Sequence, residues 1–140
     1  MTRREQALLK LQAYEIQPSA QRLAVAEHVL WSDEHPSADR VWSEVRKDFP
    51  MISRATVYNT LNLFVEKGLL RELVLEEGRV VFDPRVGAHH HFIDEDSGRI
   101  HDIDWDALRV MNVDKLPGLD VRDYMVVMRG RARPASRRSR

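Results

Sequence analysis

Residues 53–83 read SRATVYNTLNLFVEKGLLRELVLEEGRVVFD, and this stretch decides the fold. Its first half predicts an amphipathic helix, because Ser53 is a favourable N-cap and Gly68 is a favourable stop. The apolar positions at helical spacing are Val57, Leu61, Phe64 and Val65. Two apolar runs follow, residues 69–75 and 80–82, and the Glu-Glu-Gly-Arg sequence between them indicates a β-hairpin.

Three further helices are predicted upstream of this stretch. The spacing of apolar residues indicates the first helix within residues 3–15, and Ser19 and Ser37 are suitable N-caps for the second and third. Pro50 ends the third helix, so the connections between the helices are short. Helices that are joined by brief turns and followed by a hairpin are typical of a winged helix-turn-helix.

In a helix-turn-helix module, the last helix enters the major groove of DNA. The outward side chains of this helix include a guanidinium, an amide and a phenol hydroxyl, which suit base edges and phosphates. We therefore predict that the DNA-binding residues are Arg54, Thr56, Tyr58 and Asn59, with Asn62 also facing outward. The alternative is that these are ordinary polar positions facing solvent on a core helix.

The composition narrows the class of protein. The chain has 22 Lys and Arg residues against 22 Asp and Glu residues, yet its last residues, RGRARPASRRSR, are basic and are expected to be disordered. There is no cysteine, which excludes disulfides and thiolate metal sites. No apolar run could span a bilayer and the amphipathic N-terminus is no signal peptide, so we expect a cytoplasmic protein without a membrane partner.

The chain changes in character after Pro84. Strands are predicted over residues 89–93 and 99–103, a short helix over 105–110 and a final strand over 120–129. Because this region has few apolar residues for a core of its own, we expect it to pair with a second copy in a homodimer. The predicted fold class is α+β, with an N-terminal winged helix-turn-helix followed by a small αβ dimerisation domain. The predicted parts are residues 1–83 (DNA-binding domain), 84–88 (hinge), 89–129 (dimerisation and metal-binding domain) and 130–140 (disordered basic tail).

The run GAHHHFIDEDSGRIHD, residues 87–102, holds four of the six histidines in the chain. On a strand, His89 and His91 point to the same side, so their imidazoles can chelate one divalent ion. The alternative is a polar edge strand without a ligand. His90 points to the other side, and neither His90 nor His101 receives a role from the sequence.

Three other residues extend this pair toward a complete metal site. His35, Asp83 and Asp102 would add one nitrogen and two oxygen donors, but only if the two regions of the chain fold together. Imidazole and carboxylate without sulfur suit Fe(II), Mn(II) or Zn(II), and five ligands suit Fe or Mn better than tetrahedral zinc. The general order of affinities favours zinc, so the sequence leaves the metal open.

The runs HPSADRVWSEVRKDFPMISRATVYNTLNLFVEKGLLREL and FDPRVGAHHHF closely resemble the ferric uptake regulator (Fur) family. The resemblance covers residues 15–105 in order. It implies a homodimeric, metal-sensing transcriptional regulator of double-stranded operator DNA, expected to act as a repressor, and not an enzyme. The regulatory metal site of the family falls on His35, Asp83, His89, His91 and Asp102.

Within the family, the aspartates at 83 and 102 and the Tyr58-Asn59 pair resemble the peroxide-sensing branch (PerR). This resemblance implies Fe(II) or Mn(II) at the regulatory site, with Zn(II) able to take its place in purified protein. In that branch, bound Fe(II) reacts with peroxide and a ligand histidine is oxidised. The matching positions here are His35 and His89.

The sequence departs from the family where a structural zinc is usually held by two pairs of cysteines. Asp94 and Ser97 stand at the first pair, so we predict that this four-cysteine structural zinc is absent. Apolar packing must then hold the dimer, and the candidate residues are Val121, Tyr124, Val126 and Val127.

These departures and the histidine run also resemble the haem-responsive branch (Irr) of the family. The main alternative is therefore a haem- or iron-responsive regulator with haem as cofactor, followed by plain iron or manganese sensing. An enzyme with an open metal position is a further alternative in principle. The sequence has no Glu placed in a helical histidine motif to act as the catalytic base. An enzyme would also leave the winged helix without a function.

Overall fold

The computed structural model describes residues 1–134, apart from the side chain of Glu77. The chain divides into an N-terminal unit, Met1–Val86, and a C-terminal unit, Gly87–Arg140. The division falls inside the segment 84–88 that the sequence analysis describes as a hinge. Each unit is described by itself below.

The N-terminal unit begins with four helices, each started by a hydroxyl side chain. The helices are α1 (Arg3–Ala13), α2 (Ala20–Val29), α3 (Ala38–Asp48) and α4 (Arg54–Lys67). Thr2, Ser19, Ser37 and Ser53 each accept a hydrogen bond from a backbone N–H in the first turn of the following helix. These bonds satisfy donors that a helix cannot satisfy internally, so the caps set where the helices begin.

The fourth helix ends where the sequence predicts. Gly68 adopts a left-handed conformation with φ +89°, and its N–H bonds back to the last turn of α4. A residue without Cβ takes this conformation at no steric cost, which releases the chain into the hairpin. The hairpin pairs strand β1 (Arg71–Val74) with β2 (Val80–Asp83) in antiparallel register, through a 3-10 turn at Glu76–Gly78.

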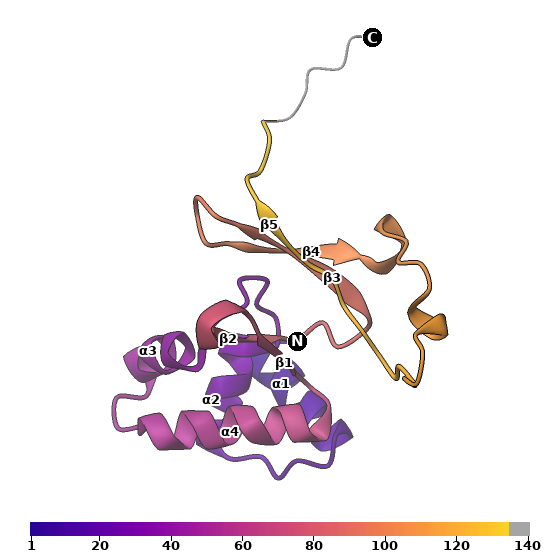
Figure 1. Ribbon diagram of the computed structural model, residues 1–140. Helices are drawn as coiled ribbons and strands as arrows, with labels where there is room; N and C mark the ends of the chain where they lie inside the picture. The colour runs from indigo at the N-terminus through magenta and orange to yellow at the C-terminus, as the bar shows by residue number, and fades with distance from the viewer. Residues whose placement is uncertain (135–140) are drawn as a thin grey trace. The chain divides into compact units, whose positions relative to one another are not determined.

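Figure 1 shows α1 to α4 together with β1 and β2, the arrangement of a winged helix-turn-helix, as predicted. A single core joins the four helices and strand β2. Its fully buried members include Leu11, Val25, Val29, Val45, Val57, Leu61 and Phe64, drawn from all four helices. The indole N–H of Trp42 donates to the carbonyl of Ile52 at 3.2 Å, which ties α3 to the turn before α4. The core therefore fixes α4 and leaves its polar side outward.

The C-terminal unit contains a three-stranded sheet in the order β4-β3-β5. Its strands are β3 (His89–Asp94), β4 (Ile100–Asp104) and β5 (Val127–Gly130). Strand β3 is paired on both edges, antiparallel with β4 and parallel with β5. The chain between β4 and β5 holds two 3-10 turns, Trp105–Ala107 and Val113–Lys115, and most of its side chains are exposed.

Two details of this unit differ from the sequence-based prediction. The helix predicted over 105–110 is a single 3-10 turn, and the strand predicted over 120–129 begins only at Val127. The N–H of Val126 donates to the ring of His90 and not to a backbone carbonyl. A side chain therefore takes the place of a strand-to-strand hydrogen bond at this residue. Of the tail predicted over 130–140, Gly130 ends β5, residues 131–134 have no regular structure, and the remainder lies outside the described residues.

Within the described residues, no helix combines the length and the apolar character that crossing a bilayer requires.

The packing of α4 predicts the effect of one substitution. Leu61→Ala should lower the free energy of unfolding by about 2 to 5 kcal/mol, because Leu61 is completely buried and its loss leaves a cavity. The neighbouring residue gives a matched control, since Asn62 is exposed and Asn62→Ala should change stability by about 0.5 kcal/mol or less. Urea unfolding followed by circular dichroism measures both. Equal losses in the two variants would contradict this assignment of the core.

Candidate functional site

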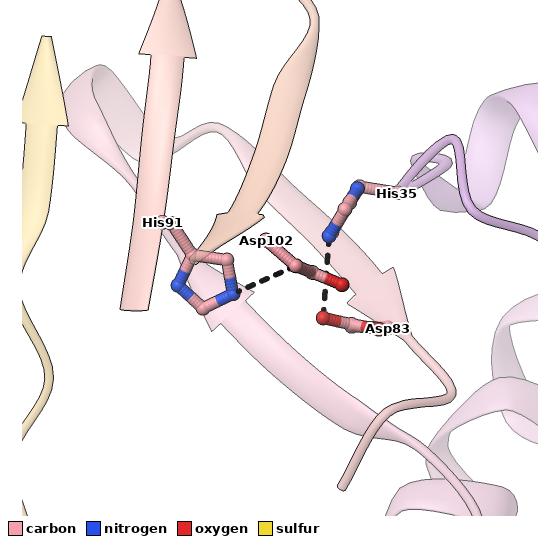
Figure 2. A group of neighbouring side chains, drawn as sticks. All are labelled: His35, Asp83, His91 and Asp102. Carbon is pink, nitrogen blue, oxygen red and sulfur yellow. Dashed lines mark ion pairs between the residues drawn. The ribbon is translucent and has the colours of Figure 1, made fainter. Parts of the chain in front are cut away.

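In the N-terminal unit, the structure brings His35 and Asp83 together. His35 Nε2 lies 3.2 Å from Asp83 Oδ2, and both side chains are almost completely buried. A buried carboxylate is costly unless it is paired or coordinates a metal. The pair therefore forms a buried, polar cluster of the N-terminal unit, and both residues are labelled in Figure 2.

Backbone geometry holds these two side chains in place. His35 has φ +51°, a left-handed conformation that residues with a side chain seldom adopt and that needs support from the surrounding structure. The N–H of Phe82 donates to the carbonyl of Pro36 at 2.9 Å, which joins the turn containing His35 to strand β2. The other oxygen of Asp83, Oδ1, accepts the N–H of Arg85 at 2.9 Å. Oδ2 is consequently aimed at His35.

In the C-terminal unit, the sheet brings His89 and His91 to Asp102. The Nε2 atoms of His89 and His91 lie 3.3 Å and 3.6 Å from Asp102 Oδ1. Both histidine side chains are fully buried, whereas the carboxylate is 23% exposed. Alternation along β3 puts the two rings on the same face, and the antiparallel register places Asp102 opposite His91. Figure 2 shows this ion pair between His91 and Asp102.

A backbone contact determines which nitrogen of His89 can bind a ligand. His89 Nδ1 lies 2.7 Å from the carbonyl oxygen of Gly87. A carbonyl can only accept, so Nδ1 carries a proton, and Nε2 is the ring nitrogen that faces Asp102 and is left for a metal. Metal-binding histidines are commonly oriented in this way through the nitrogen that does not bind the metal.

The donor types in both clusters fit a divalent metal ion. The three histidines offer imidazole nitrogen, the two aspartates offer carboxylate oxygen, and sulfur is absent from these side chains. This donor set suits Fe(II), Mn(II) or Zn(II). Of the five residues predicted as metal ligands, His35 and Asp83 lie together in the N-terminal unit, and His89 and His91 lie beside Asp102 in the C-terminal unit.

The middle histidine of the run has a different environment. His90 is 1% exposed and stacks on Trp105, with 4.5 Å between ring centroids and 15° between the ring planes. Its Nδ1 accepts the N–H of Val126 at 2.9 Å, and the carbonyl of Val126 accepts the N–H of His91 at 3.0 Å. Burial lowers the pKa of His90 below its ordinary value, with smaller contributions from His91 and His89. The ring is therefore neutral near pH 7, as an acceptor at Nδ1 requires.

The predicted DNA-binding residues lie on the first half of α4. Arg54 and Asn59 are exposed, and Thr56 and Tyr58 are half-buried. The hydroxyl of Ser53 donates to the Thr56 hydroxyl at 2.8 Å and accepts the Thr56 N–H, so Thr56 takes part in the helix cap.

Two features of the structure have no signal in the sequence. Asp39 of α3 binds both Arg54 and Tyr58. Its position in the first turn of a helix suggests only a favourable interaction with the helix dipole, so no local signal reveals the contact. The role of His90 also depends on a residue far along the chain, Val126.

Comparisons with known proteins agree with this picture. The profile of the ferric uptake regulator family matches residues 14–128. The peroxide-responsive repressor PerR of Staphylococcus aureus (strain Mu50 / ATCC 700699) is 34% identical over 104 residues, which cover 74% of this chain and 70% of that protein.

Solved structures extend the similarity to the fold. A Campylobacter jejuni peroxide stress regulator aligns with a TM-score of 0.66 and 28% identity, over 92% of this chain and 98% of that one. The Vibrio cholerae ferric uptake regulator aligns with a TM-score of 0.70, over 89% of this chain and 98% of that one. At 22% identity, the second likeness concerns the fold alone.

The environment of His90 leads to a prediction about the sheet. His90→Phe keeps an aromatic ring against Trp105 but removes the acceptor for the Val126 N–H, so it should lower the free energy of unfolding by about 1 to 3 kcal/mol. His101→Phe is the control, because His101 is half-buried on neighbouring β4. Urea unfolding and amide exchange at Val126 measure the effect. An unchanged exchange rate at Val126 would show that the ring does not hold this segment.

Proposed function

Because the chain belongs to the ferric uptake regulator family, we propose that it is a transcriptional repressor that binds operator DNA as a metal-loaded homodimer. Members of this family are metal-responsive, DNA-binding transcription regulators and not enzymes. The reading as an enzyme, weighed from the sequence, is therefore set aside. The cytoplasmic location expected from the sequence stays a prediction.

One observation carries the metal part of this proposal. Two sets of imidazole and carboxylate groups, His35 with Asp83 and the two strand β3 histidines with Asp102, offer ligands of the types that iron and manganese prefer. All of them except the Asp102 carboxylate are almost completely buried. We propose that a single ion binds both sets, with ligands His35, Asp83, His89, His91 and Asp102. Five ligands would leave one octahedral position open. Zn(II), which binds such donors more tightly, would compete in purified protein.

The proposed ion couples metal binding to DNA binding through the chain's two units. An ion that takes ligands from both units holds them in one relative arrangement. In a homodimer, that arrangement sets the distance between the two α4 helices, which must reach major grooves about 34 Å apart. The metal raises the affinity for DNA if it binds the DNA-competent arrangement more tightly than other arrangements. Linkage is reciprocal, so DNA raises the affinity for the metal by the same factor.

The DNA part of the proposal places α4 in the major groove. Asn59 is exposed and can make two hydrogen bonds to adenine, while Arg54 can bind guanine or a phosphate. Tyr58 and Thr56 complete the predicted contact set. The second copy would pair through the C-terminal unit, where Val121, Tyr124, Val126 and Val127 remain half-exposed in the single chain.

We further propose that the sensed signal is peroxide. Similarity to a peroxide-responsive repressor and to a peroxide stress regulator supports this reading. With Fe(II) bound, peroxide would transfer one oxygen atom to a nearby ligand side chain and its other oxygen would leave as water, so that side chain supplies the two electrons overall. His35 and His89 are the expected targets, and oxidation of either ring would remove a ligand and release DNA.

The haem-responsive alternative finds less support in the histidine run. A histidine that binds haem must present a ring nitrogen to the iron, and His90 is buried under Trp105 with Nδ1 already bonded. Under this proposal, the run of three histidines consists of two metal ligands, His89 and His91, and one residue, His90, that holds the sheet. Plain iron or manganese sensing uses the same five ligands and differs only in the response to peroxide.

A stoichiometry experiment tests the shared ion. Mn(II) is measured by equilibrium dialysis in the wild type, His35→Ala and His91→Ala, with His101→Ala as the control histidine outside the ligand set. We expect one tightly bound ion per wild-type chain, and affinity reduced by about 10-fold or more in each ligand variant. DNA binding in Mn(II), to a duplex enriched from a random-sequence pool by the wild type, should fall with it. Two ions per chain, each lost in only one variant, would refute a shared site.

A second experiment separates peroxide from haem. The Fe(II)-loaded and Mn(II)-loaded proteins receive the same small dose of peroxide without air, and DNA release and peptide masses are measured. We expect release only from the Fe(II) form, with one added oxygen atom in tryptic peptide 23–40 or 86–99. Fragment ions distinguish His35 from His28 in the first peptide. Release by haem without any mass gain would instead support the haem-responsive alternative.

A further inference from the structure

One acidic side chain, that of Asp39, binds both Arg54 and Tyr58 of the proposed DNA-reading helix. Arg54 Nε and Nη2 lie 2.7 Å and 3.1 Å from the two carboxylate oxygens of Asp39, a bidentate pair. The Tyr58 hydroxyl donates to Asp39 Oδ1 at 3.0 Å and accepts from Arg54 Nη2 at 3.1 Å. The guanidinium also lies over the Tyr58 ring, 5.0 Å from its centroid. The three side chains form one closed group, called here the Asp39 triad.

The Asp39 triad lies on the outside of the protein. The side chains of Arg54 and Asp39 are 56% and 59% exposed. The hydrogen bond from Arg54, followed by that from Tyr58, lowers the pKa of Asp39, so the carboxylate is charged throughout the neutral range. The triad therefore presents a neutralised arginine at a surface where a DNA-binding helix would be expected to present a positive charge.

We propose that Asp39 is a specificity-determining residue. It keeps Arg54 and Tyr58 from binding the phosphates of arbitrary DNA and releases both side chains when the operator binds. This inference rests on the proposed function of α4. Binding to arbitrary DNA depends on cations that displace counterions from phosphates. An arginine that is already paired with a carboxylate contributes little to that binding, and the carboxylate itself is repelled by phosphates.

The geometry of the pair explains how an operator could still recruit Arg54. The carboxylate engages the same fork of N–H groups that binds a phosphate or the O6 and N7 atoms of guanine. An exposed ion pair is weak and can be exchanged. The exchange is favourable where a base or phosphate stands in the right place and several other contacts form at once. On arbitrary DNA, the pair with Asp39 stays intact.

Asp39→Asn tests the inference by removing the charge while retaining the size of the side chain. The probes are the duplex enriched from a random-sequence pool by the Mn(II)-loaded wild type and a scrambled duplex of the same composition. We expect the affinity for the scrambled duplex to rise about 3- to 10-fold at low salt, with less change for the enriched duplex. One additional phosphate contact should steepen the salt dependence by about 0.9 in log–log slope.

Three further variants make the experiment specific. Glu44→Gln frees Lys47 from an exposed ion pair on the same helix α3 and changes the net charge equally, so it measures the general charge effect. Asp39→Glu should retain the wild-type ratio of affinities. Arg54→Ala in the Asp39→Asn background should abolish the gain on scrambled DNA, because Arg54 supplies the new contact. Circular dichroism and Mn(II) binding check that each variant is folded.

The outcomes separate this inference from the proposed function. If the wild type enriches and binds no duplex, the proposed function fails and the inference falls with it. If the wild type binds but Asp39→Asn weakens both duplexes equally, Asp39 is a brace for α4 and the inference alone is wrong. A gain on scrambled DNA no larger than that of Glu44→Gln would also overturn it.

Discussion

Alternation along strand β3 is the constraint on which the candidate metal site depends. Because β3 is paired on both edges, its backbone is fixed in the sheet. Successive side chains along a strand point to opposite faces, so the histidine rings alternate. His89 and His91 share one face with Asp102, while His90 turns to the other face and anchors Val126. The ligand pair and its structural support therefore come from three consecutive residues. A shift of one residue in the register would exchange these roles and destroy the site.

The cluster of His35 and Asp83 is built into the winged helix itself. Strand β2 forms the wing, and its last residue is Asp83. The hydrogen bond between Phe82 and Pro36 connects that strand to the turn that carries His35. Under the proposed function, an ion bound there would be attached to the same rigid core that holds α4. Under the same proposal, metal binding would act on the DNA-reading helix through packed side chains and not through a flexible linker.

Charge balance gives the proposed DNA-binding surface an unusual character. The chain carries equal numbers of basic and acidic residues, so its net charge adds no long-range attraction to DNA. The Asp39 triad applies the same principle locally, at the start of α4. A regulator with little affinity for arbitrary DNA depends on direct contacts and on correct dimer geometry. Control by a metal that sets that geometry is most effective when the non-specific contribution is small.

The sequence by itself determined the elements that depend on neighbours along the chain. Serine caps, apolar spacing and Gly68 predicted the four helices and the wing, and alternation predicted that His89 and His91 share a face. Resemblance to a family, and not spacing, selected Asp83 and Asp102 as ligands. Only the tertiary structure decided the contacts that join distant residues, such as Arg54 to Asp39 and Val126 to His90. The last strand begins only at Val127, directly after the residue that bonds to the His90 ring. The sequence did not predict this start, because a hydrogen bond between distant groups leaves no periodic trace.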